Sequence, residues 1–157
     1  MTKIELIDSG LIDHHDSAFP TLVRLDSGDL ICGFSRGGGA HVSGGTHCAR
    51  STDAGRSWSY QGVILEPQTD PITTNHLRLS RTGNGILLAY GQRDRKERTV
   101  DGFAHLACDP VLCRSADGGR SWSAPEIIPF QMPGPYEISN SIVVTADGRW
   151  LAPAATF

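Results

Sequence analysis

The stretch Ser51-Thr52-Asp53-Ala54-Gly55-Arg56-Ser57-Trp58 recurs 64 residues later as Ser115-Ala116-Asp117-Gly118-Gly119-Arg120-Ser121-Trp122, and this repeated octet decides the fold. Both copies follow the pattern S-x-D-x-G-R-S-W. A short apolar run with a cysteine precedes each copy, and a second apolar run follows it. Turn-forming residues between two apolar runs indicate a turn that joins two strands, and their repetition indicates a chain built of repeats.

The octet has the composition of a turn that satisfies its own polar groups. An aspartate two residues before a glycine accepts hydrogen bonds from nearby backbone N–H groups, and the glycine adopts a positive φ that other residues resist. Serine hydroxyls cap the same turn, and the tryptophan ring packs over it. We therefore interpret the octet aspartates as structural rather than catalytic. The predicted structural set is Ser51, Asp53, Gly55, Trp58, Ser115, Asp117, Gly119 and Trp122.

The composition is that of a globular chain with no preference for polyanions. The 157 residues carry 14 basic and 17 acidic side chains, so the net charge of −3 argues against nucleic acid or an anionic membrane as a partner. The N-terminal residues alternate polar and apolar side chains, as a strand does, and do not form a signal peptide. No apolar run approaches membrane-spanning length. We therefore expect a cytoplasmic location.

The cysteines show no pattern of a metal site or redox motif. None of the four forms a CxxC pair, and three of them, Cys32, Cys48 and Cys113, lie inside apolar runs. Buried free thiols are favoured over disulfides or metal ligands. No cofactor is expected.

Glycine-containing turns at 26–29, 82–85 and 146–149 form a second repeat at nearly the spacing of the octet. Each turn joins two strand-like runs, and the octet joins two more. Four antiparallel strands per repeat at this period is typical of a β-propeller blade. We predict an all-β fold with one blade at about residues 12–66, a second at about 75–130 and the start of a third at about 136–157.

Three details of this prediction can be compared directly with a structure. The third blade is expected to begin with strands at 141–145 and 150–157. The charged run 93–98 lacks an apolar face and is expected to be a solvated loop. Two and a half blades cannot close a ring, so the chain is expected to be part of a longer protein whose remaining blades complete it.

The octet resembles the Asp-box, or BNR repeat, of bacterial sialidases and their relatives. The hairpin 19–31 is similar to the first blade of that superfamily, and Phe34-Ser35-Arg36-Gly37 is similar to the end of its second strand. Ser139-Asn140, ahead of the turn at 146–149, resembles the third blade. The resemblance covers nearly the whole chain, and its motifs are more specific for the fold than for the activity.

This resemblance implies a six-bladed propeller whose ligand site lies at one end of the central channel. In sialidases an arginine triad grips the substrate carboxylate, an aspartate is the acid/base, and a tyrosine paired with a glutamate is the nucleophile. Here Ala18 stands where the first arginine of the triad is expected, and the loop after Arg36 contains no aspartate up to Arg50. His41 and His47 are its titratable residues. The catalytic residues therefore stay unassigned, and the nucleophile would lie in further blades.

Polar residues recur where each predicted blade begins and where its second strand ends. Arg36 with His41, beside three glycines, is the strongest pair, with an ordinary loop as the alternative. Asp16, following two histidines, is a candidate for contact with a sugar hydroxyl, again with an ordinary loop as the alternative. For Arg78, pairing with a neighbouring carboxylate is the alternative to a site role. The predicted substrate-binding set is Asp16, Arg36, His41, Arg78, Arg93, Glu137 and Asn140.

Two functions from different classes follow. The first is a sialidase-like glycoside hydrolase, or a relative, that binds or hydrolyses terminal acidic sugars of glycans at the channel mouth. The second is a non-catalytic Asp-box propeller that binds carbohydrate or protein. The replacement of the motif arginine by Ala18 favours the second function, and the overall resemblance favours the first.

Overall fold

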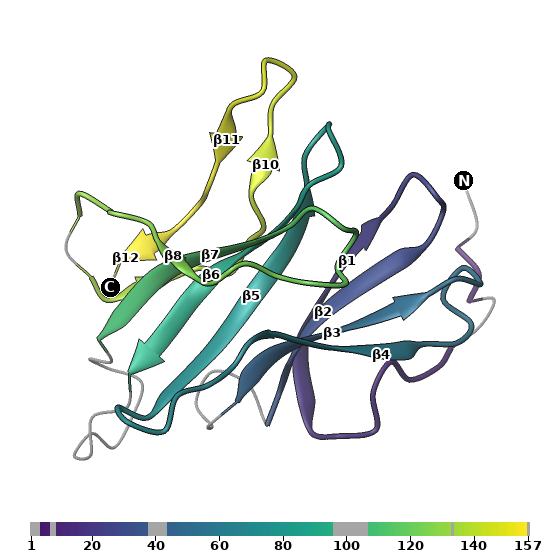
Figure 1. The fold of residues 1–157 in the computed structure, drawn as a ribbon, viewed down its shortest axis with the longest axis horizontal. Helices are drawn as coiled ribbons and strands as arrows, with labels where there is room; N and C mark the ends of the chain where they lie inside the picture. The colour runs from purple at the N-terminus through teal and green to yellow at the C-terminus, as the bar shows by residue number, and fades with distance from the viewer. Residues whose placement is uncertain (1–3, 7–8, 38–43, 96–106, 133, 157) are drawn as a thin grey trace.

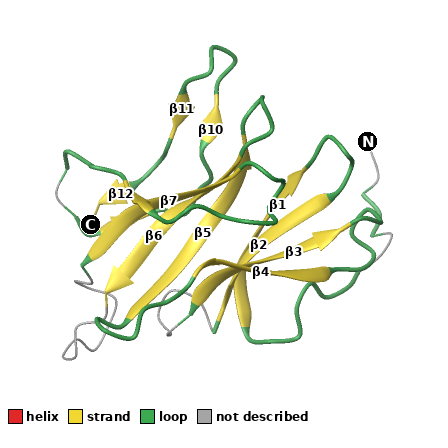
Figure 2. Cartoon of the chain, in the orientation of Figure 1, coloured by secondary structure: helices red, strands yellow, loops and turns green. Residues whose placement is uncertain are grey.

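Twelve β-strands and no helix make up the residues described by this computed structural model, which are 4–6, 9–37, 44–95, 107–132 and 134–156 (Figure 2). Within these residues no helix is long and apolar enough to cross a membrane. Figure 1 shows two four-stranded sheets side by side, followed by short strands near the C-terminus. The prediction of an all-β chain with repeated four-stranded antiparallel sheets is confirmed.

The first sheet has the strand order β1-β2-β3-β4, with every neighbouring pair antiparallel. A tight turn joins β1 to β2, and its Gly28 has a φ of 92°, the left-handed region that favours glycine. The turn closes with a bond from Gly28 N to Leu25 O of 3.0 Å. The strands are β1 (Ser17–Arg24), β2 (Leu30–Arg36), β3 (Gly45–Ser51) and β4 (Ser59–Leu65).

The second sheet repeats this plan in the order β5-β6-β7-β8. Its first turn has the same hydrogen bond, from Gly85 N to Thr82 O at 3.0 Å, and Gly85 has a φ of 87°. The strands are β5 (Thr73–Arg81), β6 (Leu87–Arg95), β7 (Cys108–Ser115) and β8 (Glu126–Ile127). The two sheets therefore share order, direction and turn geometry.

The charged run at 93–98 is not wholly a loop, so that prediction was wrong for its first residues. Arg93, Asp94 and Arg95 end β6, where they pair with residues of β5 and β7. Pairing on both edges of β6 satisfies the hydrogen-bonding groups of the backbone even where the side chains are charged. This stabilises a strand although the sequence lacks an apolar pattern. Residues 96–98 lie outside the described part of the chain.

The C-terminal segment forms two short ladders rather than the two predicted strands at 141–145 and 150–157. β10 (Val143–Val144) pairs with β11 (Trp150–Leu151), and β9 (Tyr136–Glu137) pairs with β12 (Ala155–Thr156). Pro153 lies between β11 and β12 and has no N–H to donate to a ladder, which explains the interruption. The β10–β11 hairpin projects from the body of the molecule (Figure 1). Residues 4–6, which the alternating pattern had predicted as strand, are in no strand.

Both octets form the predicted kind of self-bonded turn. Asp117 accepts hydrogen bonds from Ser115 Oγ at 2.8 Å and from Ser121 N at 3.0 Å, and Gly119 N donates to Ser115 Oγ at 2.8 Å. In the first copy, Asp53 likewise accepts from Ser51 Oγ at 2.7 Å and from Ser57 N at 2.9 Å. These carboxylates are occupied by their own turns.

An apolar core fills the space between the two sheets. Ile31 and Cys48 of the first sheet pack there with Leu79, Leu87 and further residues of the second, and all of them are buried. Gly33 permits the close approach, because a Cβ at this position would lie 2.8 Å from Leu79 Cγ. A second core cluster, centred on Leu88 and Tyr90, lies between the second sheet and the C-terminal strands.

β5 is the edge strand of the second sheet, and the edge that does not pair with β6 is hydrogen-bonded to side chains of the first sheet. Leu77 N donates to Thr46 Oγ1 at 3.0 Å, and Leu79 N donates to Thr21 Oγ1 at 2.9 Å. The buried Asn75 side chain accepts from Thr46 N at 2.9 Å and from Thr46 Oγ1 at 2.7 Å. Buried backbone donors need partners, so this seam fixes the position of one sheet against the other.

Candidate functional site

Most of the predicted site residues that the structure describes lie at or near one end of the two sheets, which we call the arginine end. Arg78 lies further along β5, and its guanidinium reaches back to Phe19 near the start of β1. The arginine end is defined by the end of β2, the start of β3, the start of β5 and the end of β6. Arg36 pairs with Gly45, and Thr73 pairs with Arg95, while Asn75 N donates to Gly44 O at 3.0 Å across the two sheets. Antiparallel order brings the strand ends of each sheet together, and the bond from Asn75 to Gly44 joins the two sheets at this end.

At the arginine end of the first sheet, Arg36 is held by a carboxylate. Its Nη2 lies 2.9 Å from one Asp13 oxygen and its Nε lies 3.2 Å from the other, a two-bond geometry that fixes the guanidinium. Asp13 also accepts from Ser17 Oγ at 2.6 Å and lies 2.8 Å from His15 Nδ1. Burial raises the pKa of Asp13, but the bonds from Arg36, Ser17 and His15 outweigh burial and hold that pKa well below its usual value.

Aromatic side chains extend this cluster across β3 and β4. The Arg36 guanidinium lies 4.8 Å from the ring centre of Tyr60, a cation–π distance. Tyr60 Oη lies 2.8 Å from His47 Nδ1, and the His47 ring stacks on Phe34 at 6.2 Å between centres. Burial, followed by the charge of Arg36, lowers the pKa of His47, which favours its neutral form.

A pocket of about 320 Å3 lies beside this cluster. Its apolar wall includes Ala18, Pro20 and Phe34, and its polar groups come from Asp13, His15 and Ser17. Asp16, which was predicted to contact ligand, does not line this pocket; its carbonyl accepts from Gly37 N at 2.8 Å and its side chain is exposed. The other predicted partner of Arg36, His41, lies outside the described residues.

Arg78 is a buried cation, only 8% exposed, on β5. Its Nη1 donates to Phe19 O at 2.8 Å, and its guanidinium lies 4.8 Å from the Phe19 ring centre. Its Nε has no hydrogen-bond partner among the residues that the structure describes. Among the described residues no carboxylate forms an ion pair with it, and burial lowers its pKa. Phe19 has a φ of 55°, a strained conformation for a non-glycine residue, within an irregular part of β1.

Arg93 does not stand free at the arginine end. Its Nη2 lies 2.9 Å from one oxygen of Asp109, and Arg95 Nη2 lies 2.5 Å from the other. Burial raises the pKa of Asp109, but the bonds from Arg95 and Arg93 outweigh it and lower that pKa. Within the described part of the chain, the Arg93 Nε has no hydrogen-bond partner.

Glu137 and Asn140, the two candidates from the C-terminal segment, line a common pocket of about 350 Å3. Ser139 shares the pocket and donates from Oγ to Glu137 at 2.6 Å. Pro153, Ala154 and Ala155 form the rest of its lining. A carboxylate, an amide and a hydroxyl beside small apolar groups suit the hydroxyl groups of a sugar.

The structure brings forward two residues that sequence reasoning missed, Asp13 and Tyr60. The hairpin around the first octet pairs Tyr60 with Ala49, so Tyr60 lies on the same face of the sheet as His47. Aligning the two strands of this hairpin in the sequence would have found Tyr60. Asp13 has no comparable signal, because it comes from an irregular segment before β1.

The described residues thus place the chain in the class of all-β proteins that are built from repeated antiparallel four-stranded sheets. No family model matches the sequence. The chain is 33% identical over 106 residues to a sialidase of Micromonospora viridifaciens, a match that covers 66% of this chain and 15% of the relative. The chain therefore spans a small part of that relative's length, and the two proteins are distantly related in sequence.

One solved structure with a low sequence identity shows the same kind of fold. A protein of unknown function from Dyadobacter fermentans superimposes with a TM-score of 0.65 and 18% identity over 86% of this chain and 45% of its own. A sialidase of Trypanosoma rangeli gives a TM-score of 0.49 and 17% identity over 77% of this chain and 22% of its own.

Proposed function

We propose that the full-length protein binds terminal acidic sugars of glycans at the arginine end, as a sialidase-like glycoside hydrolase or a relative of one. Arg78 is the observation that carries this proposal. A buried guanidinium without a described counter-charge is unfavourable unless something anionic compensates it, and a sugar carboxylate has the shape and charge to do so. The distant sequence relationship to a sialidase supports the same ligand class.

The pocket of Glu137 and Asn140 fits the neutral part of such a ligand. Its groups accept and donate hydrogen bonds with hydroxyls, and its volume of about 350 Å3 suits a single sugar ring. Sugars would thus meet a cation on β5 and hydroxyl-binding groups beside β9.

We propose further that the two sheets are blades of a six-bladed propeller whose channel mouth is the arginine end. The repeated strand order of the two sheets and their packing through β5 support this proposal. The likeness in fold to the protein from Dyadobacter fermentans, of which this chain covers 45%, agrees with a larger whole.

A non-catalytic carbohydrate-binding protein is the second candidate, and one observation favours it. Arg36 is already held through two bonds by Asp13, and Ala18 provides no cation beside it. The first sheet therefore offers fewer free guanidinium groups to a ligand carboxylate than the arginine triad of a sialidase requires.

The test uses the full-length protein on an array of sialylated and neutral glycans, together with hydrolysis of an aryl sialoside. We expect Arg78→Met to weaken binding to acidic glycans by roughly 10- to 100-fold, the range for a lost charge-assisted bond. Arg149→Met, a matched change at an exposed hairpin, is expected to leave binding unchanged. Failure of the parent protein to bind or cleave any acidic glycan would refute the proposal, and hydrolysis would decide between the two candidates.

A further inference from the structure

Two side chains of the second sheet hold the backbone of the segment that carries Glu137. On β6, Gln92 Oε1 accepts a hydrogen bond from Ile138 N at 2.8 Å. On β7, Cys108 Sγ accepts one from Tyr136 N at 3.0 Å. Glu137 lies between the two residues that are held in this way, and it lines the pocket of about 350 Å3. The second sheet therefore fixes the chain on both sides of a candidate ligand-binding residue.

The amide of Gln92 is oriented by its two partners. Ile138 N is a donor, so the amide oxygen must face it, and Nε2 then donates to Asp94 Oδ1 at 2.9 Å. Turning the amide around would bring two donors together at Ile138. Gln92 is 9% exposed and Asp94 is 3% exposed, so water does not readily replace these bonds. Asp94 thus helps to fix the direction in which Gln92 presents its acceptor.

Ile138 is held by its side chain as well as by its backbone. It is fully buried and packs with Tyr90 and Ile142 in the second core cluster. Its two neighbours in the sequence, Glu137 and Ser139, are exposed and line the pocket. Ser139 Oγ donates to Glu137 Oε1 at 2.6 Å, so the two side chains point the same way. The outward direction of this polar pair therefore depends on how Ile138 is held.

The face of β6 that carries Gln92 changes from apolar to polar along the strand. Leu88 and Tyr90 pack in the second core cluster, whereas Gln92 and Asp94, the next two residues on that face, are polar and also buried. Burying an amide and a carboxyl costs more than burying apolar side chains of similar size. Hydrogen bonds are directional, so the polar residues place Ile138 N at one position, which apolar contacts alone do not do.

We propose that Gln92 is a positioning residue for the pocket of Glu137 and Asn140. Through its bond to Ile138 N, it sets the direction of Glu137 and Ser139, and so the affinity of the pocket for the hydroxyl groups of a sugar. Gln92 acts indirectly, because it is not among the residues that line the pocket. This inference rests on the function proposed above for that pocket.

The experiment is a titration of the full-length protein and its variants with a sialylated trisaccharide. Gln92→Met keeps the length of the side chain but cannot accept from Ile138 N, so we expect binding to weaken roughly 10-fold, as for one or two misplaced hydrogen bonds. In a Glu137→Ala background the same substitution is expected to have no further effect, because the group that it misplaces is already absent. Ser115→Ala is the matched control, since it removes a buried hydroxyl at the other end of the same sheet and is expected to leave binding unchanged.

A conservative variant separates positioning from stability. Gln92→Glu keeps an oxygen for Ile138 N although it brings a second carboxyl next to Asp94. We expect it to bind the trisaccharide within about threefold of the parent even if it melts at a lower temperature. If Gln92→Met does not fold, Gln92→Asn takes its place, because the shorter amide does not reach Ile138 N and is expected to show the same loss.

The outcomes distinguish this inference from the function on which it rests. If the parent binds the trisaccharide and Arg78→Met weakens that binding while Gln92→Met does not, the proposed function stands and the positioning role is overturned. The role is also overturned if Gln92→Met costs as much affinity in the Glu137→Ala background as in the parent, since Gln92 then acts elsewhere. If the parent does not bind the trisaccharide or any other acidic glycan, both proposals are wrong.

Discussion

At the scale of single residues, the octet serines do more for the fold than the octet aspartates. Ser115 is buried, and its hydroxyl both donates to Asp117 and accepts from Gly119 N. Asp117 is exposed to solvent, which weakens the contribution of its charge. Loss of the serine hydroxyl therefore leaves a buried backbone donor, Gly119 N, without a partner, whereas the backbone donors that Asp117 accepts from are exposed to water.

We expect Ser115→Ala to lower the free energy of unfolding by about 1–2 kcal/mol, the usual cost of leaving a buried donor unpaired. Chemical denaturation of the purified chain measures this change. Ser27→Ala is the matched control, because its exposed hydroxyl takes part in one long bond of 3.4 Å, and we expect little change there. Equal effects of the two substitutions would contradict the role given to Ser115.

The candidate site contains residues of two kinds, and only one kind leaves a sequence signal. Arg78 and Glu137 were proposed because polar residues recur where each repeat begins, which the turn pattern locates. The pairing of Arg36 with Asp13 and of Arg93 with Asp109 was not foreseen. Such contacts join an irregular segment or a neighbouring strand to the arginine, and alternation along one strand says nothing about them.

At the scale of elements, the strands were predictable because turns and apolar runs alternate with a fixed period. The predictions were wrong where something other than the turn and apolar pattern determines the backbone conformation. Arg93–Arg95 are strand since both edges of β6 are paired, and the C-terminal ladders are short since Pro153 interrupts them. The seam along β5 was not foreseen either, because Thr46 and Asn75 belong to different repeats.

Asn75→Ala tests the seam between the sheets. The substitution leaves Thr46 N and Thr46 Oγ1 without their buried acceptor, so we expect a loss of about 2–3 kcal/mol in the free energy of unfolding. Urea denaturation followed by tryptophan fluorescence measures it. Asn84→Ala, in an exposed turn, is the control and is expected to cost less. A stable Asn75→Ala protein would mean that the Asn75 side chain contributes little to holding the sheets together, and that apolar packing and the remaining bonds, such as those to Thr21 Oγ1 and Gly44 O, are sufficient.

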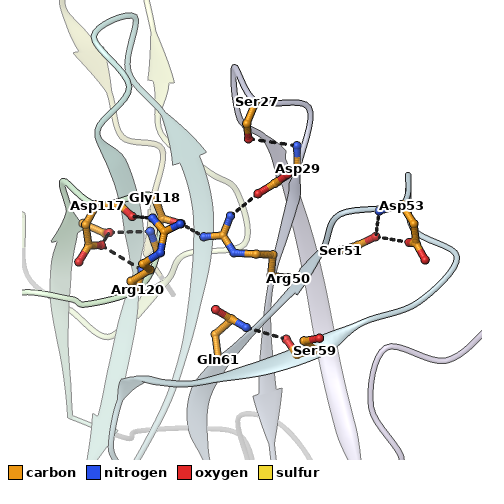
Figure 3. A network of polar contacts seen from close by, with 12 residues as sticks. Ser27, Asp29, Arg50, Ser51, Asp53, Ser59, Gln61, Asp117, Gly118 and Arg120 are labelled. Atoms are coloured by element: carbon orange, nitrogen blue, oxygen red, sulfur yellow. Dashed lines mark hydrogen bonds and ion pairs between the residues drawn. The ribbon is translucent and has the colours of Figure 1, made fainter.

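Arg50→Met tests the contact between the end of β3 and the second octet, in which Arg50 donates to the carbonyl of Gly118 (Figure 3). Methionine keeps much of the apolar stem but cannot donate to Asp29 or to the Gly118 carbonyl, so we expect a loss of about 1–3 kcal/mol. Thermal unfolding measures the loss. Arg114→Met, at the equivalent position before the second octet, pairs with the exposed Glu126 and serves as the control. If both variants unfold alike, the bond to the octet carbonyl contributes nothing beyond a surface ion pair.

At the scale of the whole molecule, the fold holds aspartates in their ionised form, some within their own turns and others in bonds between segments. Five of them, Asp13, Asp53, Asp109, Asp117 and Asp147, have pKa values lowered by the fold. The causes differ. Hydrogen bonds from Ser57 and Ser121 come first for the two octets, and one from Thr145 comes first for Asp147. For Asp13 and Asp109, bonds from arginines outweigh a burial that acts in the opposite direction.

These shifts predict that the protein loses stability in acid. A carboxyl whose pKa is lower in the folded state than in the unfolded state contributes stability that is fully present above the unfolded value, about 4, and is lost as the pH falls toward the folded value. We therefore expect the melting temperature to be level near neutral pH and to fall steadily below about pH 4. Asp13→Asn should lower the melting temperature near neutral pH and make its fall in acid shallower, because the bonds to Arg36 then no longer depend on ionisation of residue 13. A parent protein as stable at pH 3 as at pH 7 would show that these carboxylates contribute nothing to folding. An unchanged slope in Asp13→Asn would place the acid sensitivity in the turns, where each serine bonds to an aspartate of its own octet.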